Sequence, residues 1–209
     1  WLLYAAAFTV IVASIVALKQ TNIKRLLAYS TVAQLSYVVM AAAILKPLAE
    51  VGASMHIVAH AFGKITLFFA AGAIYTAAKK TEVWQLKGIG RRMPWTMAAF
   101  TIGALSMIGV PPTGGFVSKW FILAGAFESD NYVAIATIIG STVLNAAYFL
   151  PIIFAVWFSR EDPEQKLDHG EAPWPMVTAL SITAALTIGL FLFNAPLIAL
   201  ESQIVGIVK

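Results

Sequence analysis

The stretch LAEVGASMHIVAHAFGKITLFFAAGAIYTAA, residues Leu48–Ala78, decides the fold class. It is predominantly apolar over more than the roughly 20 residues that a helix needs to cross a bilayer. Further stretches of this kind lie before and after it: Trp1–Leu18, Ile23–Leu45, Pro94–Phe127, Tyr132–Phe158 and Trp174–Phe193. We therefore expect an all-α, polytopic transmembrane bundle of about six spans. It would form a single domain over residues 1–209.

The composition excludes two other classes of chain. Of the 209 residues, 60% are hydrophobic and 11% are charged, and the mean hydropathy is +0.82. A soluble domain has about 25% charged residues, and a disordered chain combines low hydrophobicity with high net charge. The absence of cysteine excludes disulfides, iron–sulfur clusters and thiolate metal sites made by this chain. Because the sequence begins at Trp1, we expect it to be a piece of a longer protein.

Lysines and arginines are unevenly distributed over the links between the spans. The first, third and fifth links hold most of them: Lys19, Lys24, Arg25, Lys79, Lys80, Lys87, Arg91, Arg92, Arg160 and Lys166. The second and fourth links and the residues after Phe193 hold only Lys46 and Lys209. Basic residues favour cytoplasmic loops, so this distribution predicts that the first, third and fifth links face the cytoplasm. The net charge of +4 therefore indicates membrane topology and not a nucleic-acid partner.

Three ionisable residues lie inside the third span, on one helix face. His56, His60 and Lys64 follow each other at intervals of four residues. A charged lysine at mid-helix costs about 2.5–3.5 kcal/mol on insertion scales, so intramembrane ionisable residues usually have a function. Two imidazoles leading to one amine are the groups that a proton relay needs. The alternatives are a metal or haem site at the two histidines, ordinary hydrogen bonding between helices, and a lysine that only pairs with an acid.

The fourth span is interrupted by GVPPTGG, residues Gly109–Gly115. A second deep lysine, Lys119, follows this interruption by one helical turn. The interrupting residues are Pro111, Pro112, Gly114 and Gly115. The prolines remove backbone donors and the glycines permit non-helical backbone. Unwound backbone at membrane depth is tolerated only inside protein or beside water, and such broken helices are typical of transporter sites. The sequence thus predicts a broken helix with Lys119 beside the break.

Two polar stripes flank these residues. Their members are Ser30, Gln34 and Tyr37 in the second span, and Ser141, Asn145 and Tyr148 in the fifth. Each set shares one helix face. Either stripe can line a water path, but ordinary hydrogen bonds between helices are the interpretation we favour.

Three of these motifs, taken together, resemble signatures of antiporter-like membrane subunits. The motifs are IKRLLAYST (Ile23–Thr31), HIVAHAFGK (His56–Lys64) and GVPPTGGFVSK (Gly109–Lys119). This superfamily comprises Mrp-type multisubunit cation/proton antiporters, proton-pumping subunits of respiratory complex I, and membrane-bound hydrogenases. KITLFF (Lys64–Phe69) and GIGRRMPW (Gly88–Trp95) look most like the D subunit of the Mrp antiporters. One departure is Asn22, where many relatives carry an acid.

The resemblance implies a function and a set of partners. It implies that Lys64 and Lys119 carry protons, with His56 and His60 as relay groups and no cofactor. It implies a multi-pass subunit of the bacterial inner membrane that works with other membrane subunits, the lipid bilayer, protons and Na⁺. No carboxylate lies deep in these spans, so an acidic partner of the lysines is expected from the rest of the protein or from a neighbouring subunit. A redox-driven pump subunit and a non-conducting structural subunit are the alternatives.

Overall fold

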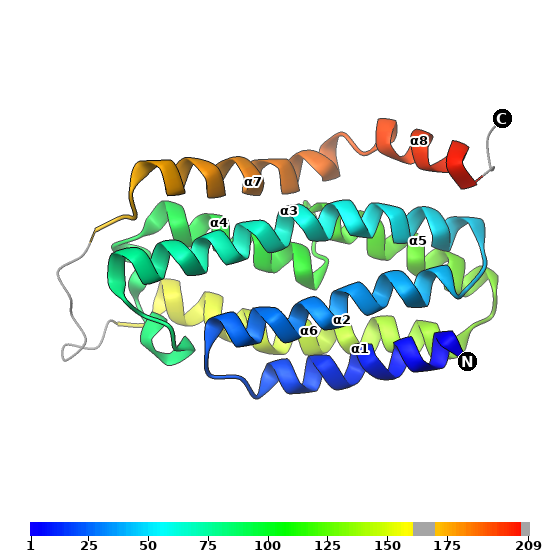
Figure 1. Cartoon of the computed structure of the whole chain (residues 1–209), viewed down its shortest axis with the longest axis horizontal. Helices are drawn as coiled ribbons and strands as arrows, with labels where there is room; N and C mark the ends of the chain where they lie inside the picture. Colours follow the sequence, from blue (N-terminus) through cyan, green and yellow to red (C-terminus); the bar gives the residue numbers. More distant parts are fainter. Residues whose placement is uncertain (161–169, 206–209) are drawn as a thin grey trace.

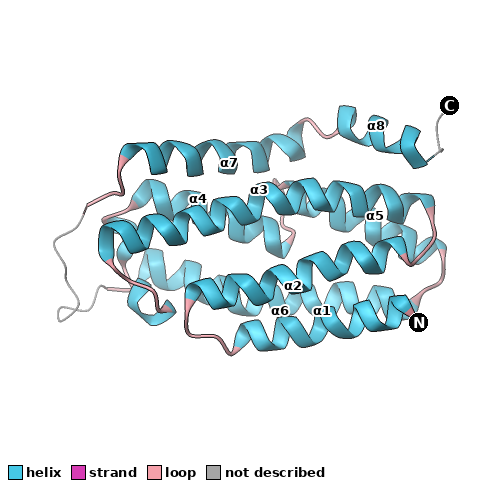
Figure 2. Ribbon diagram, viewed as in Figure 1, coloured by secondary structure: helices cyan, strands magenta, loops and turns pink. Residues whose placement is uncertain are grey.

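The structure, a computed structural model, describes residues 1–160 and 170–205. In these ranges the chain is helical with connecting loops and no named strand (Figure 2). The α-helices are α1 Leu2–Leu18, α2 Ile23–Ala42, α3 Pro47–Ala78, α4 Pro94–Ile108, α5 Gly114–Glu128, α6 Tyr132–Phe158, α7 Trp174–Leu192 and α8 Ala195–Val205. Two short 3₁₀ turns, η1 Val83–Leu86 and η2 Ile89–Arg91, lie in the link before α4. The predicted all-α bundle is confirmed.

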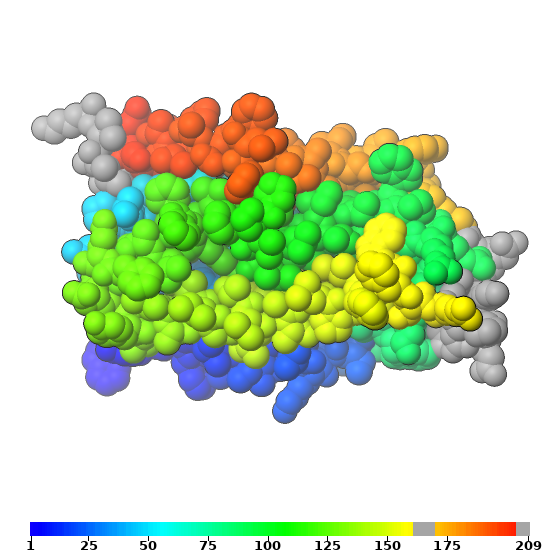
Figure 3. Space-filling model, turned by 180° about the vertical axis from the view of Figure 1, so that it is seen from behind, coloured from blue at the N-terminus to red at the C-terminus, as the bar shows by residue number. Residues whose placement is uncertain are grey.

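The helices lie nearly side by side along one axis, and α4 and α5 together make one traverse with a break about halfway (Figure 1). Helix α3 is central, because it packs against α2, α4, α5, α7 and α8. Helix α6 crosses the back of the bundle between α1 and the α4–α5 pair (Figure 3). By length and composition, α3, α6 and α7 can each cross a membrane, and α1 and α4 are shorter apolar helices. The chain is thus a multi-pass membrane bundle.

Local sequence explains where these helices begin and end. The Asn22 side chain accepts hydrogen bonds from the backbone N–H groups of Lys24 and Arg25, and so caps α2. Pro47 and Pro94 stand at the first positions of α3 and α4, where a missing N–H costs nothing. Gly109 ends α4 with φ of +89°, a left-handed conformation that glycine adopts without a steric penalty.

One end of the bundle carries most of the basic residues, and we call it the basic end. The α1–α2 link and the link after α3 meet there, as the left side of Figure 1 shows. Ile23 N–H donates to the Thr81 carbonyl at 2.9 Å, and Val83 N–H donates to the Thr21 carbonyl at 2.7 Å. The α6–α7 link also starts at this end, but residues 161–169, and with them Lys166, lie outside the described residues. The links therefore alternate between the two ends as the charge pattern predicted.

Large apolar side chains are exposed along the outside of the helices. Phe8, Leu35, Phe69 and Phe154 are among them, each more than a third exposed. Polar side chains of α2, α3, α5 and α6 lie inside instead, among them Gln34, His56, Lys119 and Asn145. This apolar outside and polar inside suit a chain whose solvent is lipid.

Candidate functional site

The three ionisable residues of α3 lie in one row inside the bundle. His56, His60 and Lys64 are 1%, 7% and 4% exposed, as expected for positions that share the face turned to the interior. The rings of His56 and His60 are stacked with their centroids 6.3 Å apart. The His60 Nε2 atom is buried and has no hydrogen-bond partner among the described residues. The row therefore contains one unsatisfied nitrogen, midway between His56 and Lys64.

Lys64 is held by the backbone of a neighbouring helix. Its Nζ donates to the Leu27 carbonyl of α2 at 3.1 Å. The same carbonyl accepts from the Thr31 hydroxyl at 2.8 Å, besides its place in the helix. No carboxylate in the described ranges is bonded to this amine. An arrangement in which Lys64 only pairs with an acid is therefore not seen among these residues.

Lys119 caps the broken end of α4. Its Nζ donates to the carbonyls of Met107 and Ile108, at 2.9 and 3.0 Å. The last carbonyls of a helix lack donors from the next turn and carry the negative end of the helix dipole, so a cation is favoured there. The side chain is 6% exposed. The predicted break is thus the feature that supplies the acceptors of the second deep lysine.

The two halves of the broken helix approach each other closely at Gly115. A Cβ atom at this position would lie 1.9 Å from the Ser106 carbonyl oxygen, which is possible only for glycine. The Gly115 N–H donates to the Ser106 hydroxyl at 3.3 Å. This contact sets the start of α5, and therefore Lys119 one turn later, against the end of α4.

The two polar stripes converge on this break. Gln34 from α2 and Asn145 from α6 both donate to the Met107 carbonyl, at 3.2 and 3.3 Å, so this oxygen has three side-chain donors including Lys119. The Gln34 Oε1 atom is 3.0 Å from His56 Nε2. The stripes thus form hydrogen bonds between helices, as we favoured, and they join His56 to Lys119 through the amide of Gln34.

The stripes continue away from the break in both directions. Tyr148 OH donates to the Asn145 side-chain oxygen and lies 3.0 Å from the Ser30 hydroxyl, which can donate to it. Tyr37 OH is hydrogen-bonded to the Ser141 hydroxyl, and the Lys119 Nζ lies over the Tyr37 ring at 5.0 Å from its centroid. These buried hydroxyls make one layer of polar contacts across α2, α5 and α6.

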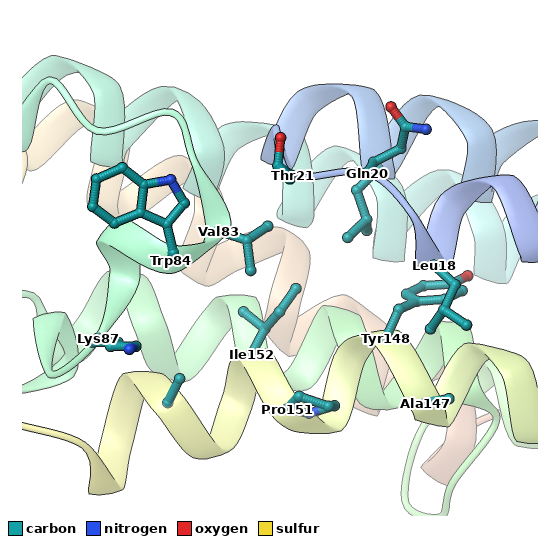
Figure 4. A pocket seen from close by; sticks show the side chains of 12 residues that line it. Leu18, Gln20, Thr21, Val83, Trp84, Lys87, Ala147, Tyr148, Pro151 and Ile152 are labelled. Carbon is teal, nitrogen blue, oxygen red and sulfur yellow. The ribbon is translucent and has the colours of Figure 1, made fainter.

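Two cavities adjoin this layer. The larger, of about 350 Å³, opens at the basic end, where Ile152 of α6 points toward Val83 and Tyr148 lies beside Leu18 (Figure 4). The smaller, of about 240 Å³, lies between α5 and α6 and has Lys119 in its wall. The polar layer therefore has space beside it at Tyr148 and at Lys119.

Sequence reasoning missed several members of this site. The carbonyls of Leu27, Met107 and Ile108 carry no signal in residue identity, and Ser118 and Ser106 were passed over. The position of Ser118 directly before Lys119 was the available clue. Within residues 1–160 and 170–205, no group of three metal-ligating side chains comes together.

Comparison with known proteins places this chain in a family. The family described as "NADH:quinone oxidoreductase/Mrp antiporter, TM" matches residues 1–145. NADH-quinone oxidoreductase subunit N of Desulforudis audaxviator is 42% identical over 72% of this chain and 30% of its own length. The D subunit of the Na(+)/H(+) antiporter of Alkalihalophilus pseudofirmus is 30% identical over 88% of this chain and 38% of its own length.

A solved structure agrees in fold. A chain of the Mrp complex from Dietzia sp. DQ12-45-1b superposes with a TM-score of 0.87 at 19% identity, over 97% of this chain and 46% of that one. The chain thus spans less than half the length of these relatives. The resemblance inferred from the motifs is confirmed: the chain belongs to the transmembrane family shared by NADH:quinone oxidoreductases and Mrp antiporters.

Proposed function

We propose that this chain conducts protons through the membrane by way of Lys64, His60, His56 and Lys119, as part of a multisubunit monovalent cation/proton antiporter of the Mrp type. The observation that carries this proposal is that both deep amines are bonded to backbone carbonyls and, among the described residues, to no carboxylate. A neutral amine still donates to a carbonyl, whereas loss of a proton from a lysine–carboxylate pair leaves an uncompensated buried anion. Carbonyl partners therefore accommodate both protonation states.

The order of the groups supports a path along α3 and across to α5. His60 lies one helical turn from both Lys64 and His56, and its free nitrogen can take or give a proton or bind a bridging water. His56 meets α5 through its Nδ1 atom, which lies 2.9 Å from the hydroxyl of Ser118, the residue before Lys119, while its Nε2 atom is held by Gln34. A charged lysine repels Na⁺, so we assign protons and not sodium ions to this path.

The partners and the location follow from the same proposal. The Alkalihalophilus relative carries the name of an Na(+)/H(+) antiporter, and the similar structure is an Mrp complex. We propose that this chain assembles with other membrane subunits in a bacterial inner membrane, that Na⁺ crosses elsewhere in the assembly, and that an acid from outside residues 1–209 faces the lysines. The cavity beside Lys119 offers room for such a side chain.

A second candidate is a redox-driven proton pump. The 42% identity to an NADH-quinone oxidoreductase subunit N favours it. In that case the same residues carry protons, and an electron-transfer partner supplies the energy. Transport driven by Na⁺ in vesicles without any electron donor supports the antiporter, while a strict requirement for a donor supports the pump.

The test uses the intact protein in its assembled complex, in vesicles with a fluorescent pH dye. Lys64→Met and Lys64→Arg are compared with Lys19→Met, which makes the same change at an exposed position. We expect both Lys64 variants to insert normally and to lose at least about tenfold in proton transport, because methionine carries no proton and arginine does not release one. Wild-type transport in Lys64→Arg would show that Lys64 only fixes packing, as expected of a non-conducting structural subunit.

A further inference from the structure

The orientation of the Gln34 amide is determined by its surroundings. One end of this amide faces the Met107 carbonyl oxygen at 3.2 Å. A carbonyl only accepts, so the NH₂ group must be at that end. The other end, Oε1, then lies 3.0 Å from His56 Nε2. Because Oε1 only accepts, His56 Nε2 must carry a hydrogen.

The other ring nitrogen of His56 faces a group that can act in either direction. His56 Nδ1 is 2.9 Å from the Ser118 hydroxyl. In the neutral ring with hydrogen on Nε2, Nδ1 is an acceptor and Ser118 must donate to it. In the charged ring, Nδ1 carries a hydrogen and Ser118 must accept.

Ser118 has a second possible acceptor at the helix break. Its hydroxyl lies 3.1 Å from the Gly115 carbonyl in the first turn of α5. A hydroxyl has one hydrogen, so Ser118 donates either to His56 Nδ1 or to Gly115. The protonation state of His56 selects between the two: the hydroxyl points at Nδ1 when the ring is neutral and at Gly115 when it is charged.

Only a few titratable groups of the described residues surround the ring of His56. Its ring lies 5.6 Å from that of Tyr37 on α2 and 6.3 Å from that of His60 on α3. On α5, Lys119 is the ionisable neighbour and follows Ser118 in the chain. Within the described residues no carboxylate takes part in this cluster.

We propose that Gln34 and Ser118 are positioning residues that hold neutral His56 as its Nε2–H tautomer and connect its protonation to the helix break of Lys119. The charged ring differs from the neutral ring by one proton on Nδ1, which the ring exchanges with the proposed path, and the Ser118 hydroxyl turns from Nδ1 to the Gly115 carbonyl when that proton is present. Gln34 meanwhile keeps Nε2 hydrogen-bonded in both states. This inference deepens the proposed function, and only its transport measurement rests on that function.

The first measurement reads the tautomer directly. The full-length protein in lipid is prepared with ring-¹⁵N histidine, and a His56→Gln sample identifies the His56 signals in solid-state NMR. We expect a single Nε2–H tautomer in the wild-type protein. Gln34→Leu removes the acceptor of Nε2–H and should lower the tautomer ratio about five- to tenfold, since one hydrogen bond is worth about 1 kcal/mol. A wild-type Nδ1–H tautomer, or no change in Gln34→Leu, would overturn the proposal.

The second measurement addresses Ser118. Ser118→Ala should shift the Nδ1 resonance of the neutral ring, because its donor is lost, and Ser118→Thr should restore it. Ser36→Ala is the matched control, because Ser36 bonds only within its own helix. In vesicles, the pH profile of transport should move in Ser118→Ala and return in Ser118→Thr. If the Nδ1 resonance or the pH profile were the same in the wild-type protein, Ser118→Ala and Ser118→Thr, the role of Ser118 would be overturned.

The two proposals fail in different ways. Normal proton transport in Lys64→Met would contradict the proposed function, while the tautomer of His56 would still be read in the same membranes. If His56 of the wild-type protein were the Nδ1–H tautomer while Lys64→Met still abolished transport, only this inference would be contradicted.

Discussion

The substitution Gly115→Ala tests whether the close approach at the break holds Lys119 in place. The added methyl carbon would lie 1.9 Å from the Ser106 carbonyl oxygen and 3.0 Å from its hydroxyl oxygen. Because the first of these is a backbone atom, α5 must move away from α4. Overpacking costs about 1–3 kcal/mol, and the charge-assisted bonds of Lys119 to Met107 and Ile108, if lost, cost about 1.5–3 kcal/mol more.

The expected result is a loss of about 3 kcal/mol or more in the free energy of unfolding, together with a loss of proton transport. Thermal unfolding in detergent and dye-detected transport in vesicles measure the two effects. Gly189→Ala is the control, because Gly189 lies in α7 with no atom within 4 Å of an added Cβ. That change should be neutral or stabilising by up to about 1 kcal/mol. If Gly115→Ala unfolded and transported like Gly189→Ala, the reasoning about the break would be refuted.

Three further changes probe the ends of the site and the tail. Asn22→Ala removes the cap of α2 and should lower the free energy of unfolding by about 0.5–2 kcal/mol, which thermal unfolding against the wild-type protein measures. Lys119→Met should lower the free energy of unfolding more than Lys64→Met does in the same assay. The reason is that the Ile108 carbonyl loses the Nζ that satisfies it, while the Leu27 carbonyl keeps its partner in the helix. Equal losses in the two variants would contradict this account. In α8, outside the spans, burial raises the pKa of the Glu201 carboxyl to about 7, and its Oε2 has no partner among the described residues. Because burial raises this pKa, the protonated carboxyl favours the docking of α8 on α3 at low pH, and this contribution is lost as the pH rises through about 7. Hydrogen exchange of the α8 amides, corrected for intrinsic rates, should therefore be slower at about pH 5 than at about pH 8, and Glu201→Gln should remove the difference.

Apolar runs and breaker residues were sufficient to predict the helices. Each predicted span has a counterpart in the structure. A helix that crosses a bilayer needs a long apolar run, and proline and glycine interrupt helices, so both signals can be read locally from the sequence. The break in the fourth span was found for the same reason. The spacing of His56, His60 and Lys64 likewise gave their common face, since helical periodicity alone determines it.

What the sequence could not provide was the identity of the partners. Lys64 and Lys119 are held by carbonyl oxygens, and every residue has one, so no residue type marks Leu27 or Met107 as an acceptor. The contact between Gly115 and Ser106 depends on the angle at which α5 leaves the break, which is a tertiary property. No helix was predicted from the sequence at α8, because a short amphipathic segment has no unique placement.

The two lysines differ in how their acceptors become available, and this difference explains why a broken helix is needed. Leu27 lies within α2, where its carbonyl already accepts from the helix backbone and from the Thr31 hydroxyl, so Lys64 shares this oxygen with two other donors. Met107 and Ile108 lie at the end of α4, where the break frees whole carbonyls and adds the helix dipole. An unbroken fourth span would provide neither, and Lys119 would then need an anion beside it. The break therefore gives Lys119 backbone acceptors that do not depend on an anion, and this is what allows the buried amine to keep these partners whether or not it holds its proton.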